Sequence, residues 1–433
     1  MTERATIFAL SSGMPPAAIA IVRISGSLAA MAVKSMAGKL PLPRRASVRT
    51  LRHPTTGEHL DRALVLWFPG PDTATGEDLA ELHLHGGRAV VQAVISALAG
   101  QDGMREALPG EYTRRAFENG RIDLSEAEGL ADLLFAETEA QRRSAIAMAE
   151  GYFSRRVAQW QTDILGISAL VEAELDFSDE DDVSGSAEEK VAEALGRIVA
   201  EIEGELLRPT AERLRDGVRV VLAGPPNAGK STLLNALVGR DAAIVSPIAG
   251  TTRDRIEVPV AIGGFPFLVT DTAGLRDKSG DEIEGIGIDL ARRAMVEGDI
   301  VLWLGPPELC PQDLVDRLIR IETKSDLPGE RAYPESDISL SALTGEGMSV
   351  LQKMLVERAQ TLLPRDGEYA LNKRQRVALT QLKHELAMGM KTSDYLAVAE
   401  HLRVARAALD AVTGRASTED MLNTLFGSFC IGK

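Results

Sequence analysis

The spacing of apolar residues divides the chain into parts of different character. Residues 18–24 (AIAIVRI) form an apolar run broken only by Arg23, and residues 79–85 (LAELHLH) alternate between apolar and polar. Gly86 and Gly87 then lead into a helical stretch that reads RAVVQAVISALA. Short apolar runs and period-two alternation are typical of strands, so residues 1–118 are predicted to form a mixed α/β domain.

Apolar residues recur at helical spacing over residues 121–215 and again beyond residue 363. An acidic stretch, residues 178–186 (SDEDDVSGS), interrupts the first region and is expected to be a solvated loop. The apolar stripes consist of Leu124, Ala127, Leu130, Leu134, Val157, Trp160, Leu165, Val191, Leu195, Ile198, Ile202 and Leu206. Long amphipathic stretches of this kind predict a helix bundle.

A strand–loop–helix pattern lies between the two helical regions. An apolar run (Val218, Val220, Val221 and Leu222) stops at Gly224, and helix-forming residues follow Ser231. The sequence between them, GPPNAGKS, has the G-x-x-x-x-G-K-S spacing of a phosphate-binding P-loop. Backbone N–H groups of such a loop wrap a polyphosphate, Lys230 reaches the β- and γ-phosphates, and Ser231 coordinates Mg²⁺. The alternative is a glycine-rich turn without a ligand, and the complete motif in this context favours the nucleotide.

The fold predicted from these patterns is a multidomain protein that combines α/β and all-α parts, since 433 residues exceed one ordinary core. The expected domains are an N-terminal α/β domain at 1–118, a first helical part at 119–215, a P-loop domain at 216–362, and a second helical part at 363–433 that ends in a Cys-Ile-Gly-Lys tail. The P-loop domain is thus expected to be inserted within the helical domain.

Motifs downstream of the P-loop indicate that the nucleotide is GTP. Residues 250–254 (GTTRD) supply a switch threonine for Mg²⁺, and residues 269–274 (VTDTAG) end a strand near the metal. Residues 323–326 (TKSD) place a carboxylate that accepts from guanine N1–H and the 2-amino group, donors that adenine lacks. The predicted GTP-binding residues are Asn227, Ala228, Gly229, Lys230, Ser231, Thr232, Ser246, Pro247, Ile248, Ala249, Gly250, Thr251, Thr252, Asp271, Thr272, Ala273, Gly274, Thr323, Lys324, Asp326, Ser341, Ala342 and Leu343.

The residues available for hydrolysis differ from those of Ras-like enzymes. Leu275 follows DTAG, where Ras-like enzymes carry the glutamine that orients the attacking water. The acidic run 281–284 (DEIE) is the nearest replacement. Asn227 and residues 246–250 offer oxygens to a monovalent cation that would act as an arginine finger does. Asn227 equally suits a purely loop-stabilising role, and both interpretations remain open.

Polar residues also interrupt the predicted strands of the N-terminal domain. Arg23 in an apolar strand is costly unless it finds an anionic partner, and Glu81 is the candidate for an internal ion pair. The alternative is that Arg23 and Glu81 together hold a ligand. His83 and His85 share the face of Glu81 and could bind a metal, although an outward polar face is the simpler interpretation.

Composition limits the cellular context. No apolar run approaches the ~18 residues of a membrane span, and the first residues lack a signal-peptide layout, so we expect a cytoplasmic protein with no membrane partner. Cys310 and Cys430 are far apart, which fits a reducing compartment. The net charge is −15 and no basic stripe is evident, so a nucleic acid would be bound locally or presented by a basic partner.

The motifs together resemble one family. GPPNAGKS, IAGTTRD, DTAGLR, PGEYTRRAFENGRIDL and the terminal CIGK, with a GTPase domain inserted in a split helical domain, resemble the MnmE-type (TrmE) tRNA modification GTPases over essentially the whole chain. The resemblance implies a K⁺-dependent GTPase that modifies C5 of the wobble uridine (position 34) of certain tRNAs to an aminomethyl or carboxymethylaminomethyl derivative. It implies a hetero-oligomer with an MnmG-type flavoprotein that carries FAD. It also implies a homodimer formed through an N-terminal domain that binds 5-formyl- or 5,10-methylene-tetrahydrofolate.

The resemblance also assigns roles to residues. The folate contacts fall on Arg23, Glu81, Arg121 and Lys433. The K⁺ ligands fall on Asn227, Ser246, Ile248 and Thr251, and the Mg²⁺ ligands on Ser231 and Thr252. Glu284 matches the carboxylate that orients water through a second water, and Cys430 matches a tail cysteine implicated in the modification chemistry.

Two departures from the family pattern carry expectations of their own. TKSD replaces the commoner NKxD, so one amide contact to the base and the P-loop is expected to be lost. The segment 305–320 is short compared with the family pattern, so this part of the GTPase domain is expected to be trimmed or loosely ordered. Two rival functions remain: a ribosome-assembly GTPase switch without modification chemistry, and a helical scaffold whose GTPase domain is inactive.

Overall fold

The computed structural model describes residues 4–176, 184–241, 257–272, 291–328, 333–415 and 419–432. The chain divides into two compact units, Met1–Ala131 with Asp410–Lys433, and Asp132–Leu409. No helix of the described part is long and apolar enough to span a bilayer.

The first unit is built on a six-stranded sheet. Its strands are β1 (Thr6–Leu10), β2 (Ile19–Ser25), β3 (Ser47–Arg52), β4 (His59–Phe68), β5 (Leu79–His85) and β6 (Met104–Glu106). They lie in the order β3-β4-β5-β2-β1-β6, with every pair antiparallel except β1 and β6. The two strands predicted from the sequence are therefore confirmed as the neighbours β2 and β5.

One face of this sheet carries the hydrophobic core. Helices α1 (Ala29–Ala37) and α2 (Arg88–Ala99) bury alternate strand residues, among them Val22 and Leu82, which are completely inaccessible to solvent. Residues of the opposite parity on the same strands, such as Ile21 and His83, stay partly exposed on the other face. The alternation read from residues 79–85 therefore separates a core face from a polar face, as expected.

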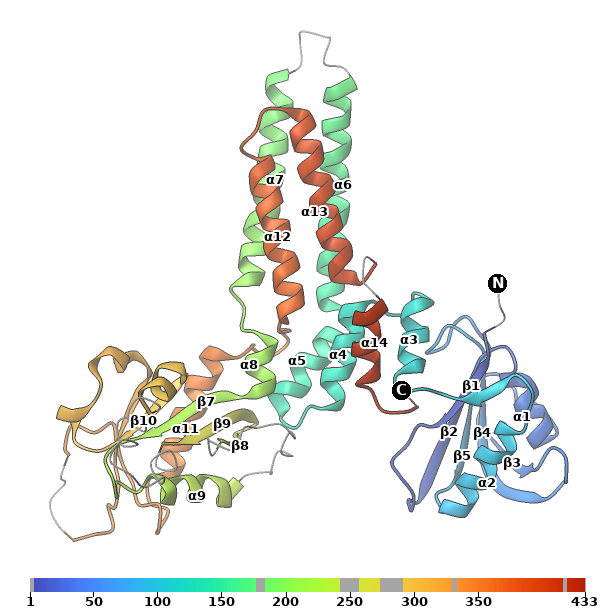
Figure 1. The fold of residues 1–433 in the computed structure, drawn as a ribbon, viewed down its shortest axis with the longest axis horizontal. Coiled ribbons are helices and arrows are strands. Elements are labelled where there is room, and N and C mark those ends of the chain that lie inside the picture. Colours follow the sequence, from blue (N-terminus) through green and yellow to red (C-terminus); the bar gives the residue numbers. More distant parts are fainter. Residues whose placement is uncertain are drawn as a thin grey trace. The chain divides into compact units, whose positions relative to one another are not determined.

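The end of the chain returns to this first unit. Helix α14 (Glu419–Gly427) packs on α3 (Glu111–Glu118), and Figure 1 shows the two side by side near the C-terminus. Beyond α14, a Cβ added at Gly432 would lie 2.4 Å from the Leu10 carbonyl oxygen, so the tail touches the end of β1. Only a glycine permits so close an approach.

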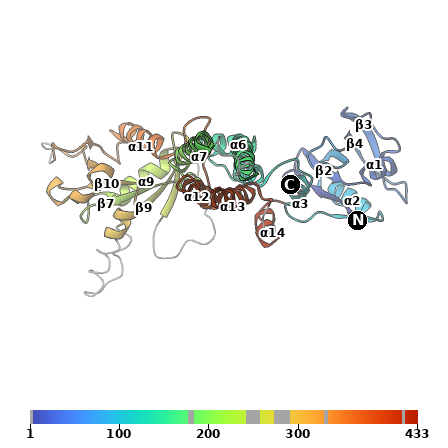
Figure 2. The ribbon, with the colours of Figure 1, turned by 90° about the horizontal axis from the view of Figure 1, so that it is seen from above.

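The second unit contains most of a helix bundle. Its helices are α5 (Glu139–Ala149), α6 (Tyr152–Asp176), α7 (Ser184–Leu206), α12 (Lys373–Gly389) and α13 (Tyr395–Thr413), and α4 (Leu124–Leu134) leads into it. Figures 1 and 2 agree that α6, α7, α12 and α13 run alongside one another. One position in the predicted stripes is wrong: Leu165 is 49% exposed, and Ile164 and Ile167 are buried in its place. Because the helix continues without a break from Trp160, the next inward position lies one turn later, at residue 164.

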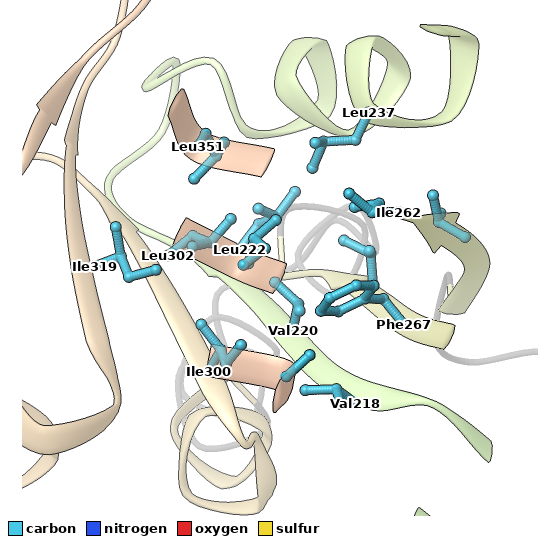
Figure 3. Close-up of a cluster of buried hydrophobic side chains, with 14 of the residues drawn as sticks. Val218, Val220, Leu222, Leu237, Ile262, Phe267, Ile300, Leu302, Ile319 and Leu351 are labelled. Atoms are coloured by element: carbon cyan, nitrogen blue, oxygen red, sulfur yellow. The ribbon is translucent and has the colours of Figure 1, made fainter. Parts of the chain in front are cut away.

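A GTPase-type sheet completes the second unit. The strands are β7 (Val218–Ala223), β8 (Glu257–Ile262), β9 (Phe265–Asp271), β10 (Ile300–Leu304), β11 (Leu318–Glu322) and β12 (Ile338–Ser339), in the order β12-β11-β10-β7-β9-β8. All pairs are parallel except β8 and β9. Figure 3 shows Val220 and Leu222 of β7 among core residues from the neighbouring strands and from α9 (Lys230–Asp241) and α11 (Met348–Leu362). Since parallel strands are buried on both faces, β7 is apolar and buried at every position except the exposed Arg219.

The connection from β10 to β11 is short. Two 3₁₀ helices, Pro307–Leu309 and Gln312–Arg317, fill the crossover where a parallel connection usually carries an α-helix. The crossover is short, as expected for a trimmed segment, and the Trp303 Nε1 group donates to the Pro306 carbonyl oxygen at its start (3.0 Å).

Two segments join the GTPase-type part to the bundle. Thr210, just before α8 (Ala211–Asp216), forms a parallel β-bridge with Leu371, just before α12. Beside this bridge, the buried Tyr369 hydroxyl donates to Glu205 Oε2 at 2.9 Å. The outgoing and returning segments therefore lie side by side, which agrees with an insertion. The exact domain boundaries stay predictions.

Candidate functional site: a phosphate-binding loop and a second polar site

The loop after β7 lies at the point where the sheet order reverses, since β7 has β9 on one side and β10 on the other. Open α/β sheets bind ligands at such switch points. Gly224 begins the loop with a φ of 145°, and a Cβ there would lie 2.1 Å from the Leu304 carbonyl oxygen. The first glycine of the motif is therefore required by the fold itself.

Lys230 is buried although it is charged. Its side chain is at the N-terminus of α9, and Nζ donates to the carbonyl oxygens of Gly224 (3.0 Å) and Pro225 (2.8 Å). Both acceptors belong to the loop, so the ammonium group is held inside the loop that the sequence assigns to phosphates. A helix N-terminus with a fixed cation is a favourable environment for an anion.

Ser231 and Asp271 bring two oxygen donors together. The Ser231 hydroxyl donates to Asp271 Oδ2 at 2.6 Å, and Asp271, at the end of β9, is 3% exposed. Thr272 follows, and its hydroxyl donates to the Leu222 carbonyl oxygen at 2.7 Å, which fixes the end of β9 against β7. A hydroxyl and a carboxylate at this spacing are the kinds of oxygen ligand that Mg²⁺ prefers.

Residues 323–326 (TKSD) contact the P-loop on the side where the guanine base is expected to bind. The Thr323 hydroxyl donates to the Ala228 carbonyl oxygen at 2.8 Å, and Lys324 Nζ donates to the Asn227 carbonyl oxygen at 3.0 Å. On the P-loop side, the amide contact expected to be lost is thus replaced by a hydroxyl contact. Asn227 and Lys324 both have left-handed backbones, with φ of 61° and 64°. Such strain in non-glycine residues is typical of functional loops.

The two segments assigned to the base are adjacent. Ser325 N donates to the Leu340 oxygen at 3.2 Å, which places TKSD beside the loop of Ser341, Ala342 and Leu343. Asp326 and Leu343 are exposed, whereas Ser341 is buried. The exposed carboxylate and leucine are thus available to a base that enters from solvent.

Several predicted site residues lie outside the described residues. They are Ser246, Pro247, Ile248, Ala249, Gly250, Thr251, Thr252, Ala273, Gly274, Glu284 and Lys433. The described P-loop residues of the prediction, from Asn227 to Thr232, form one continuous loop and helix start with Asp271 beside them.

A second polar site lies on the exposed face of the N-terminal sheet. Arg23 of β2 and Glu81 of β5 stand directly opposite each other, and the guanidinium donates twice to Glu81 Oε1, at 2.9 and 3.2 Å. His83 Nε2 lies 3.1 Å from the other oxygen, Oε2. Burial alone would raise the pKa of Glu81, but the bonds to His83 and Arg23 outweigh it and leave this pKa below its usual value. The structure contains the Arg23–Glu81 ion pair, one of the two interpretations that the sequence left open.

Tyr112 of α3 extends this site, and it was missed in the sequence. Its hydroxyl donates to the Arg23 carbonyl oxygen at 2.7 Å, and the Arg23 guanidinium lies 5.9 Å from its ring centroid. Burial raises the pKa of the Tyr112 hydroxyl well above its ordinary value, so the group stays a proton donor. No periodicity could have revealed a contact between residues so far apart in sequence.

The other residues predicted to contact folate do not all lie beside Arg23 and Glu81. Arg121 pairs with Asp72 at 3.0 Å, and no described contact joins it to Arg23 or Glu81. The C-terminal tail does come near Arg23. Gly432 contacts Leu10 of β1, and Leu10 is next to Ala9, the residue that pairs with Arg23. Cys430 is exposed on that tail.

His83 and His85 have separate carboxylate partners. His85 Nδ1 lies 2.7 Å from Asp61 Oδ1, while His83 contacts Glu81. Among the described residues, no three His, Cys, Asp or Glu side chains form a metal-binding group. The pair fits the polar strand face better than a shared metal.

The sheet order, the P-loop at its switch point, the Ser231–Asp271 pair and the TKSD contact define a P-loop protein of the GTPase class. The family model described as the MnmE helical domain matches residues 124–430, and that of the GTP-binding protein TrmE N-terminus matches residues 6–121. The chain therefore belongs to the MnmE family of tRNA modification GTPases.

Individual proteins agree with this assignment. The tRNA modification GTPase MnmE of Rhizorhabdus wittichii is 58% identical over 99% of this chain and 96% of its own length. That of Novosphingobium aromaticivorans is 54% identical over 99% of both chains. Among solved structures, the G domain of the T. maritima FeoB iron transporter aligns with 33% of this chain and 99% of its own, at 24% identity and a TM-score of 0.23, which is too weak a likeness to bear on function.

Proposed function

We propose that the chain hydrolyses GTP in a K⁺-dependent reaction and thereby drives modification of the wobble uridine of tRNA at C5. The observation that carries this proposal is the union, in one chain, of the Ser231–Asp271 P-loop site with the Arg23–Glu81 site. Relatives of this architecture are named tRNA modification GTPases. The product would be an aminomethyl or carboxymethylaminomethyl uridine.

The described residues support the GTP part in a definite way. Lys230 is held by loop carbonyls and would exchange them for the β- and γ-phosphates. Ser231 and Asp271 suit Mg²⁺, which would neutralise phosphate charge when bound. Asp326 is exposed at the base side, where it would accept from guanine.

The K⁺ assignment rests on Asn227, whose exposed side chain sits on a strained turn of the P-loop. The remaining proposed ligands are Ser246, Ile248 and Thr251, and Thr252 would complete the Mg²⁺ site. A monovalent cation there would supply the positive charge that an arginine finger supplies elsewhere. Glu284 would orient the attacking water.

The N-terminal site fits a ligand with both donor and acceptor edges. Arg23 presents N–H donors and Glu81 presents carboxylate oxygens on a half-exposed sheet face, and both keep a defined geometry through Tyr112 and His83. A tetrahydrofolate bound there would supply the one-carbon unit. Arg121 and Lys433 are proposed as further contacts, and Cys430 as a participant in the modification.

The same sheet face supports a homodimer. Ile19, on the same strand and the same face as Arg23, is 58% exposed. An exposed apolar side chain beside a polar centre suits contact with a second copy of the domain. A flavoprotein partner of the MnmG type, carrying FAD, would provide the redox step, and the reaction would take place in the cytoplasm.

The deciding experiment is analysis of wobble uridines in tRNA from cells that lack this chain. Loss of the C5-modified uridine, restored by the wild-type gene, is the expected result. Intact modification together with a ribosome-assembly defect would instead support the rival GTPase switch.

The folate part has a separate test on the full-length chain. Tetrahydrofolate binding is expected for the wild type and should weaken at least tenfold in Arg23→Gln, since a charge-assisted hydrogen-bond donor is lost. Unchanged binding in the variant, or no binding by the wild type at millimolar ligand, would remove folate from the proposal while leaving the GTPase assignment intact.

A further inference from the structure

A group of basic residues surrounds β3, the outer strand of the N-terminal sheet. Residues 39–62 contain six Lys and Arg residues and only two acidic ones, in a chain whose net charge is −15. We call this group the basic edge; its members are Lys39, Arg44, Arg45, Arg49, Arg52 and Arg62. The sequence shows no regular stripe because the six residues follow no helix or strand period.

The fold brings these residues together. Among the described strands, β3 pairs only with β4. Thr50 of β3 lies opposite Arg62 of β4, and Arg52 follows Thr50 two residues later on β3. Figures 1 and 2 both show β3 and β4 beside α1. At the other end of the hairpin, Arg44 N donates to the Trp67 oxygen at 2.8 Å. Arg49 and Arg52 thus lie on β3, a strand about 20 Å long, Arg62 lies beside it on β4, and Arg44 and Arg45 come just before it in the chain.

Few internal contacts use the charges of the basic edge: among the described residues, the Arg44 guanidinium lies 5.9 Å from the centroid of the Phe68 ring. None of the six forms an ion pair with a carboxylate of the described chain. Where their side chains bond, the acceptors are backbone oxygens: Arg49 donates to Val48 (3.2 Å), Arg52 to Gly57 (3.1 Å), and Arg44 to Asp72. Five of the six are exposed, and the half-buried Arg49 keeps Nε without a described partner.

Some arginines elsewhere in the same unit, by contrast, form ion pairs with carboxylates. Arg105 pairs with Glu111, and Arg115 with Glu77 at 2.8 Å, so these positive charges are neutralised. Of the two acidic residues within 39–62, Asp61 is 7% exposed and bonded to His85. The basic edge thus keeps a net positive charge toward solvent in an otherwise acidic protein.

We propose that the basic edge binds the phosphate backbone of the RNA substrate. This inference rests on the proposed function in tRNA modification and names a surface for that substrate. Contacts from Lys and Arg to phosphates supply most of the affinity for nucleic acids, and guanidinium groups match phosphate oxygens in pairs. Without such a surface, a chain with fifteen excess negative charges repels RNA.

Two alternative roles of the basic edge lead to different outcomes. Charged side chains on an edge strand also prevent pairing with another sheet, and this role needs no ligand. A basic surface can instead bind anionic lipid headgroups. The arms of the following experiment separate these cases.

The test compares two triple variants of the full-length chain with equal loss of charge. The first is Lys39→Gln, Arg45→Gln and Arg52→Gln. The matched control is Lys353→Gln, Lys391→Gln and Arg403→Gln, which removes three exposed charges outside the basic edge. Binding of an unmodified tRNA transcript is measured by fluorescence anisotropy at several salt concentrations, with thermal melting and GTP turnover as checks on folding.

For the basic-edge variant we expect affinity at least tenfold weaker near 0.1 M salt, with a slope of log affinity against log salt smaller by about two. The control should change by less than twofold. Equal weakening in both variants, no change in either, or no tRNA binding by the wild type would overturn the proposal, as would binding of phosphatidylserine vesicles in place of tRNA. None of these outcomes changes the expected result of the wobble-uridine analysis. A failure of the RNA-binding proposal can therefore be distinguished from a failure of the proposed function.

Discussion

At the scale of single residues, the nucleotide site is organised by hydrogen bonds that exist within the chain itself. Lys230 is held by Gly224 and Pro225, Ser231 by Asp271, and the P-loop carbonyl of Ala228 by Thr323. Because Ala228 turns its carbonyl toward Thr323, its position in the loop is set before phosphate binds. Thr323 is thus a positioning residue of the phosphate loop.

The hydroxyl of Thr323 should matter more than its methyl group. Thr323→Val removes the bond to Ala228 at nearly constant volume and is expected to cost about 1 kcal/mol, roughly fivefold in GDP affinity. Thr323→Ser keeps the hydroxyl and should stay within about twofold of the wild type. Dissociation of a fluorescent GDP analogue measures both, and equal rates for Val and Ser would show that the bond is unimportant.

The pKa of Glu81 gives a pH dependence with a definite sign. The folded-state pKa lies below the ordinary value of 4.5, so ionised Glu81 stabilises the fold above about pH 4.5 and loses this effect as pH falls through the lowered pKa. Glu81→Gln should therefore show a smaller fall in thermal midpoint between pH 5.5 and pH 3 than the wild type. Parallel melting curves for the two proteins over this range would contradict the Arg23–Glu81–His83 assignment.

At the scale of elements, glycines fix where neighbouring segments meet. Gly110, before α3, has a φ of 67°, and a Cβ there would lie 2.0 Å from the Phe426 carbonyl oxygen of α14. Gly120, after α3, has nearly the same φ, 65°, but open space around it. The two positions share backbone strain and differ only in the contact to α14.

This pair allows the contact to be measured. Gly120→Ala should cost about 1 kcal/mol from the left-handed backbone alone. Gly110→Ala should cost about 2 kcal/mol more, because α14 must move away from α3. Thermal denaturation gives the difference, and hydrogen exchange of residues 419–427 should rise in Gly110→Ala only. Similar exchange in both variants would mean that α14 is not held by this approach.

At the scale of the whole molecule, one chain carries two polar sites in separate compact units. The GTPase-type part is bridged to the bundle at Thr210 and Leu371, while the tail that bears Cys430 returns to the N-terminal sheet. In the proposed function, GTP would bind in the second unit and the tetrahydrofolate in the first.

The proposed cation and carboxylate can be tested on the complete protein. GTP turnover should be at least tenfold faster in K⁺ than in Na⁺, because a correctly sized cation stabilises transition-state charge. Glu284→Ala should reduce turnover at least a hundredfold while GTP still binds, since only water activation is lost. Equal turnover in the two salts would show that the cation assignment is wrong.

Local patterns in the sequence were sufficient for the parts of the protein that depend on neighbouring residues. The P-loop, the strands β2 and β5, the long helices and the GTPase class all follow from periodicity and motif spacing, because backbone geometry links residues only a few positions apart. The shortened β10–β11 connection was equally visible, because chain length limits what a crossover can contain.

Only the tertiary structure decided which distant residues meet. It placed Tyr112 on Arg23, Thr323 on the P-loop, Arg121 on Asp72 and Gly432 on Leu10. It also gathered the basic edge along β3 from residues without a common period. These contacts join segments far apart in sequence, and they depend on strand order and helix packing, which one-dimensional spacing does not contain.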